Sequence, residues 1–232
     1  MRRDETEKEI TKRTTQLSDH VLHYLDVFEQ VDKFTGPSVY FHHKTIQRLG
    51  ALGAPSAAVQ DQAFLEYLYA TLTAWGLHRM GPKGSKLVSF ETFATSLRTY
   101  ASRLDPFCGL RIESLATHDV SSLSESLWGI MEAIEVSATE SKIVAGSKTL
   151  HHLLPNLVPP IDRVHTAEFF LWRNRMQYKQ REMFSDIFPR LVQLAKSIAG
   201  RVNTYLGRGF NTSLPKIVDN AIVGFIVDQT GQ

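Results

Sequence analysis

The sequence predicts an all-α fold, organised as a single globular domain over residues 1–232. Apolar residues recur at steps of three and four in at least five segments, which is the spacing of one helix face. Strand-like alternation is slight, and we find neither an internal repeat nor a low-complexity segment. With 232 residues, 43% of them hydrophobic, the chain is long enough to bury a substantial core.

The first helix is expected over residues 2–34, because Gly36-Pro37 then forms a helix-breaking pair. Residues 1–10 are mostly charged, so we expect them to fray. The apolar stripe of this helix consists of Ile10, Leu17, Val21, Leu25, Phe28 and Val31.

A short helix is expected next, over residues 40–49, and it carries the neighbouring His42 and His43. Adjacent helical residues point about 100° apart, so this pair is poorly placed to share one metal ion. We therefore interpret both histidines as structural or surface residues.

A core helix is expected to start at Ser56 or Asp61, either of which can cap it, and to run through Leu77. The loop over residues 81–86 then carries two lysines and two glycines. It is either a plain connection between helices or a contact for a phosphate group.

Ser89 is expected to cap the next helix, which ends at Asp105-Pro106. Residues 107–117 form either a short strand or an irregular connector. A further helix, capped within residues 121–124, is expected to run to Val136.

The stretch over residues 143–170 holds the densest group of chemically interesting residues. Lys148 is expected at the start of a helix that ends at Pro155-Asn156. Pro159-Pro160 then stiffens the approach to Asp162, which is expected to cap another helix. The separation is 162 − 148 = 14 residues. The stiff turn between the two helices therefore lets Lys148 and Asp162 point into one cleft.

Two more helices complete the expected fold. One covers residues 184–206, in which Pro189 marks either a kink or the first turn. The last begins at the cap Ser213, has Pro215 in its first turn, and presents a continuous apolar face that belongs in the core.

Composition restricts the functional classes only loosely. A net charge of +2 neither requires nor excludes a nucleic-acid partner. The single cysteine, Cys108, excludes an internal disulfide and a cysteine-based zinc site. No apolar run is long enough to cross a membrane, and the charged N-terminus does not resemble a signal peptide. We expect a cytoplasmic protein without a cofactor; the sequence does not indicate its oligomeric state.

The stretch from Ile143 to Thr166 resembles the helix-hairpin-helix DNA glycosylase superfamily. The matching residues are Gly146, Ser147, Lys148 and Thr149, followed by 158–161 and then by Asp162. The chain departs from the family pattern at two points. Val144 stands where the family has its first hairpin glycine, and the helix before the aspartate is several residues shorter.

This resemblance implies an all-helical glycosylase-like architecture and duplex DNA as the partner. It implies catalytic roles for Asp162, as an electrostatic or general-base carboxylate, and for Lys148, as an amine nucleophile. It also implies an aromatic-lined pocket for a flipped base, for which Trp75, Phe169, Phe170 and Trp172 are candidates. The implied DNA-binding residues are Gly146, Ser147, Thr149, Arg163, Arg173 and Arg175.

Each of these residues also has a structural interpretation. Asp162 can serve as a helix cap, Lys148 as a surface cation, and the basic segment around residues 172–181 as a solvated linker. His151 and His165 are close enough to Asp162 in sequence for a metal site, but we predict no metal. The alternative function is therefore a non-catalytic helical interaction or structural module.

Overall fold

The computed structural model describes residues 3–31, 36–77, 80–81, 84–139, 142–173 and 179–231. The all-α prediction is confirmed, because the two named strands in these ranges, β1 (Met80–Gly81) and β2 (Gly84–Ser85), have two residues each. The helices are α1 (Arg3–Asp19), α2 (Val21–Glu29), α3 (Pro37–Leu52), α4 (Pro55–Ala58), α5 (Gln62–Leu72), α6 (Phe90–Thr99), α7 (Val120–Ala133), α8 (Lys142–Leu153), α9 (Thr166–Phe169), α10 (Gln180–Ile198) and α11 (Leu214–Thr230).

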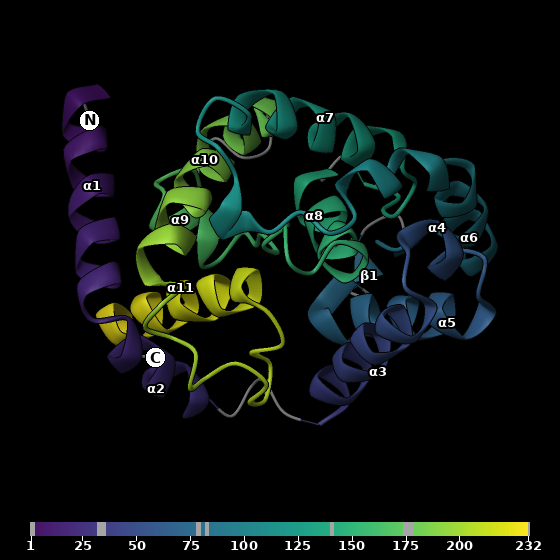
Figure 1. Ribbon diagram of the computed structural model, residues 1–232, viewed down its shortest axis with the longest axis horizontal. Coiled ribbons are helices and arrows are strands. Elements are labelled where there is room, and N and C mark those ends of the chain that lie inside the picture. The colour runs from purple at the N-terminus through teal and green to yellow at the C-terminus, as the bar shows by residue number, and fades with distance from the viewer. Residues whose placement is uncertain are drawn as a thin grey trace.

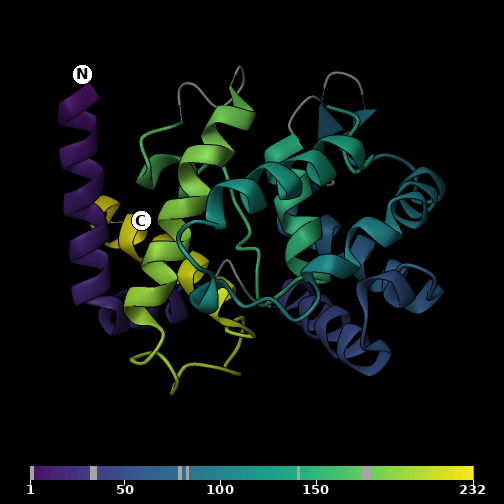
Figure 2. The same cartoon turned by 45° about the horizontal axis from the view of Figure 1, so that its top comes forward.

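The helices form two groups, and both ends of the chain lie in one of them. Figure 1 shows α1, α2, α9, α10 and α11 on one side of the molecule, and α3 to α6 on the other. Helix α8 packs against α3 and α5 of the second group. Helix α7 packs against both α8 and α10, and so connects the two groups. The view in Figure 2 shows the same division from a second direction. The chain thus leaves the first group after α2 and returns to it at α9.

Helix α11 lies at the centre of the first group and packs mainly against α2. Every residue of α11 from Leu214 to Val227 is buried, including three polar ones. The Ser213 hydroxyl accepts a hydrogen bond from the Lys216 backbone N–H at 3.4 Å, and Pro215 lies in the first turn. The expected cap and core position of this helix are therefore confirmed.

Gly224 permits an unusually close approach between α11 and α2. A Cβ atom at this position would lie 1.8 Å from the backbone oxygen of Tyr24, which is far inside van der Waals contact. Glycine is therefore required here for a steric reason, because its backbone angles are ordinary for a helix. The ring of Tyr24 packs on Phe225, with centroids 5.1 Å apart, and covers the same contact.

The single helix expected over residues 2–34 is instead two helices, and this prediction is wrong. The backbone of His20 leaves the helical region, with φ −115° and ψ 28°, so α2 turns away from α1. The turn lets α2 lie along α11 while α1 packs against α10. The predicted apolar stripe is nevertheless buried from Ile10 to Phe28. Its residues up to Leu25 pack in the main core, and Phe28 packs in a smaller cluster with Phe210, Val223 and Val227.

The helix expected to run to Leu77 is also divided. Helix α4 is a single turn, and the Asp61 carboxylate then caps α5 by accepting the Phe64 backbone N–H at 2.7 Å. After Leu72 the chain continues as a distorted turn, η1 (Thr73–Leu77), in which Gly76 has φ 85°. This distortion turns Trp75 out of the regular α-helical path.

The remaining elements follow the predictions more closely. Ser89 caps α6, which ends five residues earlier than expected and continues into short 3-10 turns. Residues 107–117 are an irregular connector with a single 3-10 turn, so the strand alternative is wrong. Helix α10 begins four residues before and ends eight residues before the bounds expected for it, and Pro189 is its tenth residue, outside the first turn. Among the described residues, no helix combines the length and the hydropathy that crossing a membrane requires.

Replacing Ile222 with alanine should strongly destabilise the protein. The Ile222 side chain is fully buried in α11, so truncation leaves a cavity in the core. We expect the free energy of unfolding to fall by about 2–5 kcal/mol, measured by urea denaturation. Leu22→Ala, at an exposed aliphatic residue of α2, is the control and should cost little. A loss below about 0.5 kcal/mol for Ile222→Ala would place α11 outside the core.

Replacing Gly224 with alanine should separate α2 from α11. The added methyl group collides with a backbone oxygen, which cannot rotate away as a side chain can. We expect a loss of about 3 kcal/mol or more in unfolding free energy. Gly50→Ala is the matched control, because that glycine lies in α3 with open space around it. This control should be neutral or stabilising by about 0.5–1 kcal/mol.

Candidate functional site

A cleft of about 670 Å³ opens between the two groups of helices. Its walls come from η1 and α8 on one side, and from residues 160–165 and the start of α11 on the other. The volume lies within the range typical of small-molecule sites. The charged or titratable residues of its lining are Lys86, Lys148, Asp162, Arg163, His165, Lys216 and Asp219. Its aromatic lining residues are Phe28, Trp75 and Phe210.

Asp162 is held in place by the turn that follows it. Its carboxylate accepts the backbone N–H groups of His165 and Thr166, at 2.6 and 3.2 Å, and the Nδ1 atom of His165 lies 2.8 Å away. The capping prediction is thus correct for this turn. The long helix expected after Asp162 is wrong, because α9 has only four residues and then meets Leu171, whose φ is 59°.

The Asp162 carboxylate is strongly acidic although the site shields it from water. Burial alone would raise its pKa. The hydrogen bond and positive charge of His165, the charge of Lys148 and the His165 backbone N–H outweigh burial and lower the pKa to about 2. A quarter of the side chain remains exposed. The cleft therefore contains a fixed negative charge over the whole physiological pH range.

Lys148 reaches the same cleft from the middle of α8. Its Nζ atom donates a hydrogen bond to the Trp75 carbonyl oxygen at 3.1 Å and lies 5.8 Å from the centre of the Trp75 ring. The distorted backbone of η1 is what offers this carbonyl to a side chain. The structure thus brings Lys148 and Asp162 to one cleft, as expected. The expectation that Lys148 begins a helix is wrong, because α8 starts six residues earlier, at Lys142.

The predicted hairpin around Gly146 is also wrong, because Gly146, Ser147 and Thr149 are buried inside α8. Gly146 allows α8 to approach α7 closely, since a Cβ atom there would lie 2.8 Å from the side chain of Met131. The Thr149 hydroxyl donates to the backbone oxygen of Ala145, four residues earlier. Buried residues present no surface to a DNA backbone, so the DNA-binding roles implied for these three residues lose their structural basis.

Ser147 has a different role, which the sequence did not reveal. Its hydroxyl oxygen accepts the backbone N–H of Ile161 at 3.0 Å, and both residues are completely buried. This bond joins α8 to the residue before Asp162. Ser147 therefore sets the position of Asp162 relative to Lys148, its own neighbour in α8.

The predicted basic residues are only partly placed at the cleft. Arg163 is exposed and lines it. Arg173 is exposed but pairs with Glu168 at 3.5 Å, and Arg175 lies outside the described residues. Two further cations of that segment also have acidic partners, since Lys179 pairs with Glu182 and Arg181 with Glu125. The described part of this segment therefore carries little uncompensated positive charge.

Of the four aromatic residues predicted to form a pocket wall, only Trp75 lines the cleft. Phe169 and Phe170 are completely buried in the core. The Trp172 indole N–H donates to Asp186 at 2.6 Å, outside the cleft. No sequence pattern indicated that Phe28 and Phe210 would line the cleft instead, because both come from segments more than 40 residues away from Trp75.

A second charged pair was missed by sequence reasoning, although it lies in the same cleft. The Lys216 ammonium group contacts Asp219 and Asn220, each at 2.6 Å, and all three side chains are buried. Burial and the negative charge of Asp162 raise the pKa of Asp219, and the positive charge of Lys216 lowers it. Burial is the largest of these effects, so the pKa of Asp219 is raised overall. The available signal was that Lys216, Asp219 and Asn220, at steps of three and four, interrupt the apolar first half of the helix.

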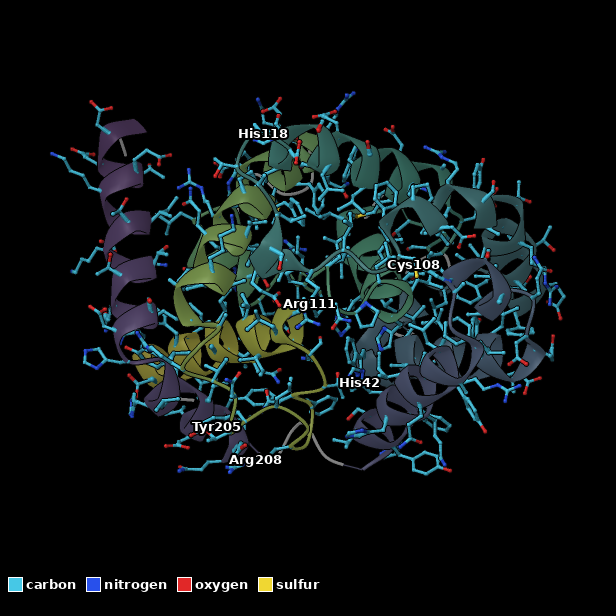
Figure 3. The ribbon with its side chains drawn as sticks, viewed as in Figure 1. His42, Cys108, Arg111, His118, Tyr205 and Arg208 are labelled. Atoms are coloured by element: carbon cyan, nitrogen blue, oxygen red, sulfur yellow. The ribbon has the colours of Figure 1, made fainter. Side chains whose placement is uncertain are left out.

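Three buried histidines connect the two groups of helices. Hydrogen bonds run from Thr212 to His42 at 2.8 Å, from His42 to His152 at 2.9 Å, and from His152 to the Lys148 carbonyl oxygen at 2.8 Å. Figure 3 places His42 between α3 and the segment that leads into α11. The ring of His151 stacks on that of His42, with centroids 5.8 Å apart. The structural interpretation of His42 is confirmed; its neighbour His43 contacts the Gly209 carbonyl oxygen.

The two histidines that could share a metal ion with Asp162 do not both contact it. His165 contacts Asp162, but His151 instead donates to the Val158 carbonyl oxygen at 2.9 Å. Within the described ranges, no three histidine, cysteine, aspartate or glutamate side chains are grouped as metal ligands.

Comparison with protein-family models, with curated proteins and with solved structures found no match to this chain. The resemblance of residues 143–166 to the helix-hairpin-helix glycosylases therefore stays a prediction. In that stretch the structure brings Lys148 and Asp162 to one cleft, and residues 142–153 form the continuous helix α8.

The buried histidines should make folding sensitive to mild acid. Burial lowers the pKa of His42 and His151 well below 6.5 and that of His152 to about 4. The unfolded chain therefore binds more protons below pH 6.5, and stability should fall as the pH drops from about 6.5 toward 4. The free energy of unfolding can fall by at most about 1.4 kcal/mol per pH unit for each histidine.

Urea denaturation at pH 7, 6 and 5 measures this dependence. His118→Gln, at an exposed histidine, is the control and should show the same pH dependence as the unchanged protein. A stability that stays constant from pH 7 to 5 would contradict the buried, neutral state of the three rings.

Proposed function

We propose that the protein binds duplex DNA and that its cleft is a glycosylase-type site, in which Asp162 and Lys148 act on a sugar carbon. The observation that carries this proposal is their convergence: two residues 14 positions apart line one cleft, with Lys148 close enough to lower the pKa of Asp162. The cleft lies where the chain returns to its first helical group, because its lining combines residues of η1 and α8 with residues 160–165 and the start of α11. The local resemblance to the glycosylase superfamily supports the same function.

The chemistry follows from the state of the Asp162 carboxylate. With a pKa of about 2 it is a weak base, so its contribution is electrostatic. A fixed carboxylate in a water-poor cleft stabilises the positive charge that develops on the sugar as the bond to the base breaks. His165 and the two backbone N–H groups hold this carboxylate in position, so little reorganisation is needed during the reaction.

Lys148 carries a positive charge beside Asp162 and becomes the nucleophile after its ammonium group releases one proton to water. The nitrogen forms a bond to C1′, and the base departs with the electron pair of the broken C1′–N bond. When the sugar ring opens, an imine forms between Lys148 and C1′. The two amine protons end on the departing base and on the ring oxygen. Attack by water at C1′ would release the base by the same bond cleavage, without an imine.

The second candidate function is a non-catalytic helical module. It is favoured by the structural contacts that both residues make: Lys148 donates to the Trp75 carbonyl oxygen, and Asp162 caps a turn. Under this alternative neither residue needs a substrate. Substitutions at both positions would then alter stability alone.

DNA binding and base release test the proposal directly. The protein should bind duplex oligonucleotides, with an affinity that falls at least about tenfold between about 50 and 200 mM salt. Asp162→Asn should abolish base release and leave binding intact, because asparagine keeps the cap and removes the charge. Lys148→Ala should weaken binding or abolish the imine, which borohydride traps as a covalent adduct.

Two matched controls separate these effects from general damage. Asp61→Asn removes the charge of a capping aspartate far from the cleft. Lys142→Ala removes another α8 lysine that donates to a backbone carbonyl. Both should leave base release unchanged. Absence of DNA affinity at low salt would refute the proposed function and leave the helical module.

A further inference from the structure

The polar cluster of Lys216, Asp219 and Asn220 has no part in the chemistry proposed for Lys148 and Asp162, yet it lines the same cleft. Its side chains project from the first two turns of α11, the most completely buried helix of the described chain. The Lys216 ammonium group also lies 5.1 Å from the Trp75 ring centre and 5.2 Å from that of Phe210. The cluster is thus enclosed by aromatic groups on a wall of the cleft.

Packing alone does not account for a charged pair at this position. Lys216 and Asp219 side chains are each exposed by only a tenth or less. Removing two charges from water costs more than burying apolar residues of similar volume, so such pairs contribute little to stability. The remaining hydrogen bond of the cluster, from Asn220 to Asn211 at 2.7 Å, holds Asn220 in place. The cluster is therefore rigid, and its burial costs free energy of folding, which is typical of a binding site.

The hydrogen-bonding capacity of the cluster exceeds its internal contacts. An ammonium group has three N–H donors, and Lys216 uses two of them on Asp219 and Asn220. One oxygen of Asp219 accepts from Lys216, and a carboxylate has a second oxygen. The cluster therefore has one N–H donor and one carboxylate oxygen beyond its internal hydrogen bonds.

The balance of charge in the cleft selects the kind of ligand. Lys216 and Asp219 neutralise each other. The rest of the lining has three cations, Lys86, Lys148 and Arg163, against the carboxylate of Asp162, so the phosphates of a nucleic acid can be attracted to the cleft while the cluster itself stays neutral. At the cluster, a neutral group with an acceptor next to a donor fits Lys216 and Asp219 at once.

We propose that Lys216, Asp219 and Asn220 form a recognition subsite for the lactam edge of a neutral heteroaromatic ring, as found in uracil and hypoxanthine. The ring carbonyl accepts from Lys216, and the adjacent ring N–H donates to Asp219. Trp75, Phe28 and Phe210 form the apolar surroundings of the ring. Adenine and cytosine present an amino group and an unprotonated ring nitrogen at this edge, so they mismatch both contacts.

This inference rests on the proposed function, because it assigns the base to the α11 end of the cleft and the sugar to the Asp162 end. The cleft volume of about 670 Å³ accommodates a base together with its sugar. The subsite can nevertheless be tested without DNA, since a free base contains the whole lactam edge.

The test measures the binding of free uracil, hypoxanthine, cytosine and adenine to the full chain by NMR titration. Uracil and hypoxanthine should bind at least about tenfold more tightly than cytosine and adenine, because a mismatched site leaves buried polar groups unpaired. Hypoxanthine should shift the backbone amide signals of Lys216 and Asp219 in the unchanged protein. Equal binding of the four bases, or no binding, would overturn the proposal.

Two substitutions sharpen the result. Asp219→Asn replaces the acceptor by a group that also donates, so the preference for lactam bases should fall at least about tenfold. Lys216→Met removes the donor while keeping an unbranched apolar stem of similar length, one atom shorter, and should weaken hypoxanthine binding by a similar factor. Asp186→Asn, at a half-buried ion pair outside the cleft, is the control and should bind all four bases as the unchanged protein does.

Thermal melting of each variant shows whether it folds. If a variant does not fold, the shifts of the Lys216 and Asp219 amide signals in the unchanged protein still show whether hypoxanthine binds at the cluster. The two proposals also fail separately. Base release from DNA without lactam binding would refute the subsite alone. Lactam binding without base release or DNA affinity would refute the glycosylase function and leave a site for small heterocycles.

Discussion

The contact between α2 and α11 at Gly224 is the constraint on which the rest of the structure depends. It allows two helices from opposite ends of the chain to approach until the backbone of Tyr24 occupies the place of a side chain. Helix α11 is thereby buried on all sides. Its first turns carry Lys216, Asp219 and Asn220 to the cleft, so the composition of the cleft wall follows from helix packing and not from a loop.

The two carboxylates of the cleft differ because their surroundings solvate them differently. Asp162 receives two backbone N–H groups and His165, which replace water as hydrogen-bond donors and stabilise the charged form. Asp219 is more deeply buried and depends on Lys216. Their pKa values therefore move in opposite directions, although they face the same space. Such a division is common where one carboxylate provides charge and another group provides recognition or a proton.

The shared cleft of Lys148 and Asp162 could be predicted, but the reason given for it was incorrect. The resemblance to the glycosylases implies that Gly146 belongs to a hairpin that opens a helix. In the structure the same glycine lets α7 and α8 approach, and the serine beside it holds the segment before Asp162. A glycine required by a neighbouring helix and one required by a turn look alike in a single sequence. Only the atoms that surround the glycine in the folded structure distinguish these two cases.

The sequence by itself determined the features that depend on residues within one or two helical turns. These include the apolar helix faces and the caps at Asp61, Ser89 and Ser213, because each cap contacts a backbone N–H three residues ahead. Tertiary structure decided where helices break, as at His20 and Trp75, and which distant side chains meet, as do His42 and His152. It also decided that Lys216 and Asp219 face a cleft. The physical reason is that burial and electrostatic pairing depend on segments far apart in the chain, whose positions no local pattern records.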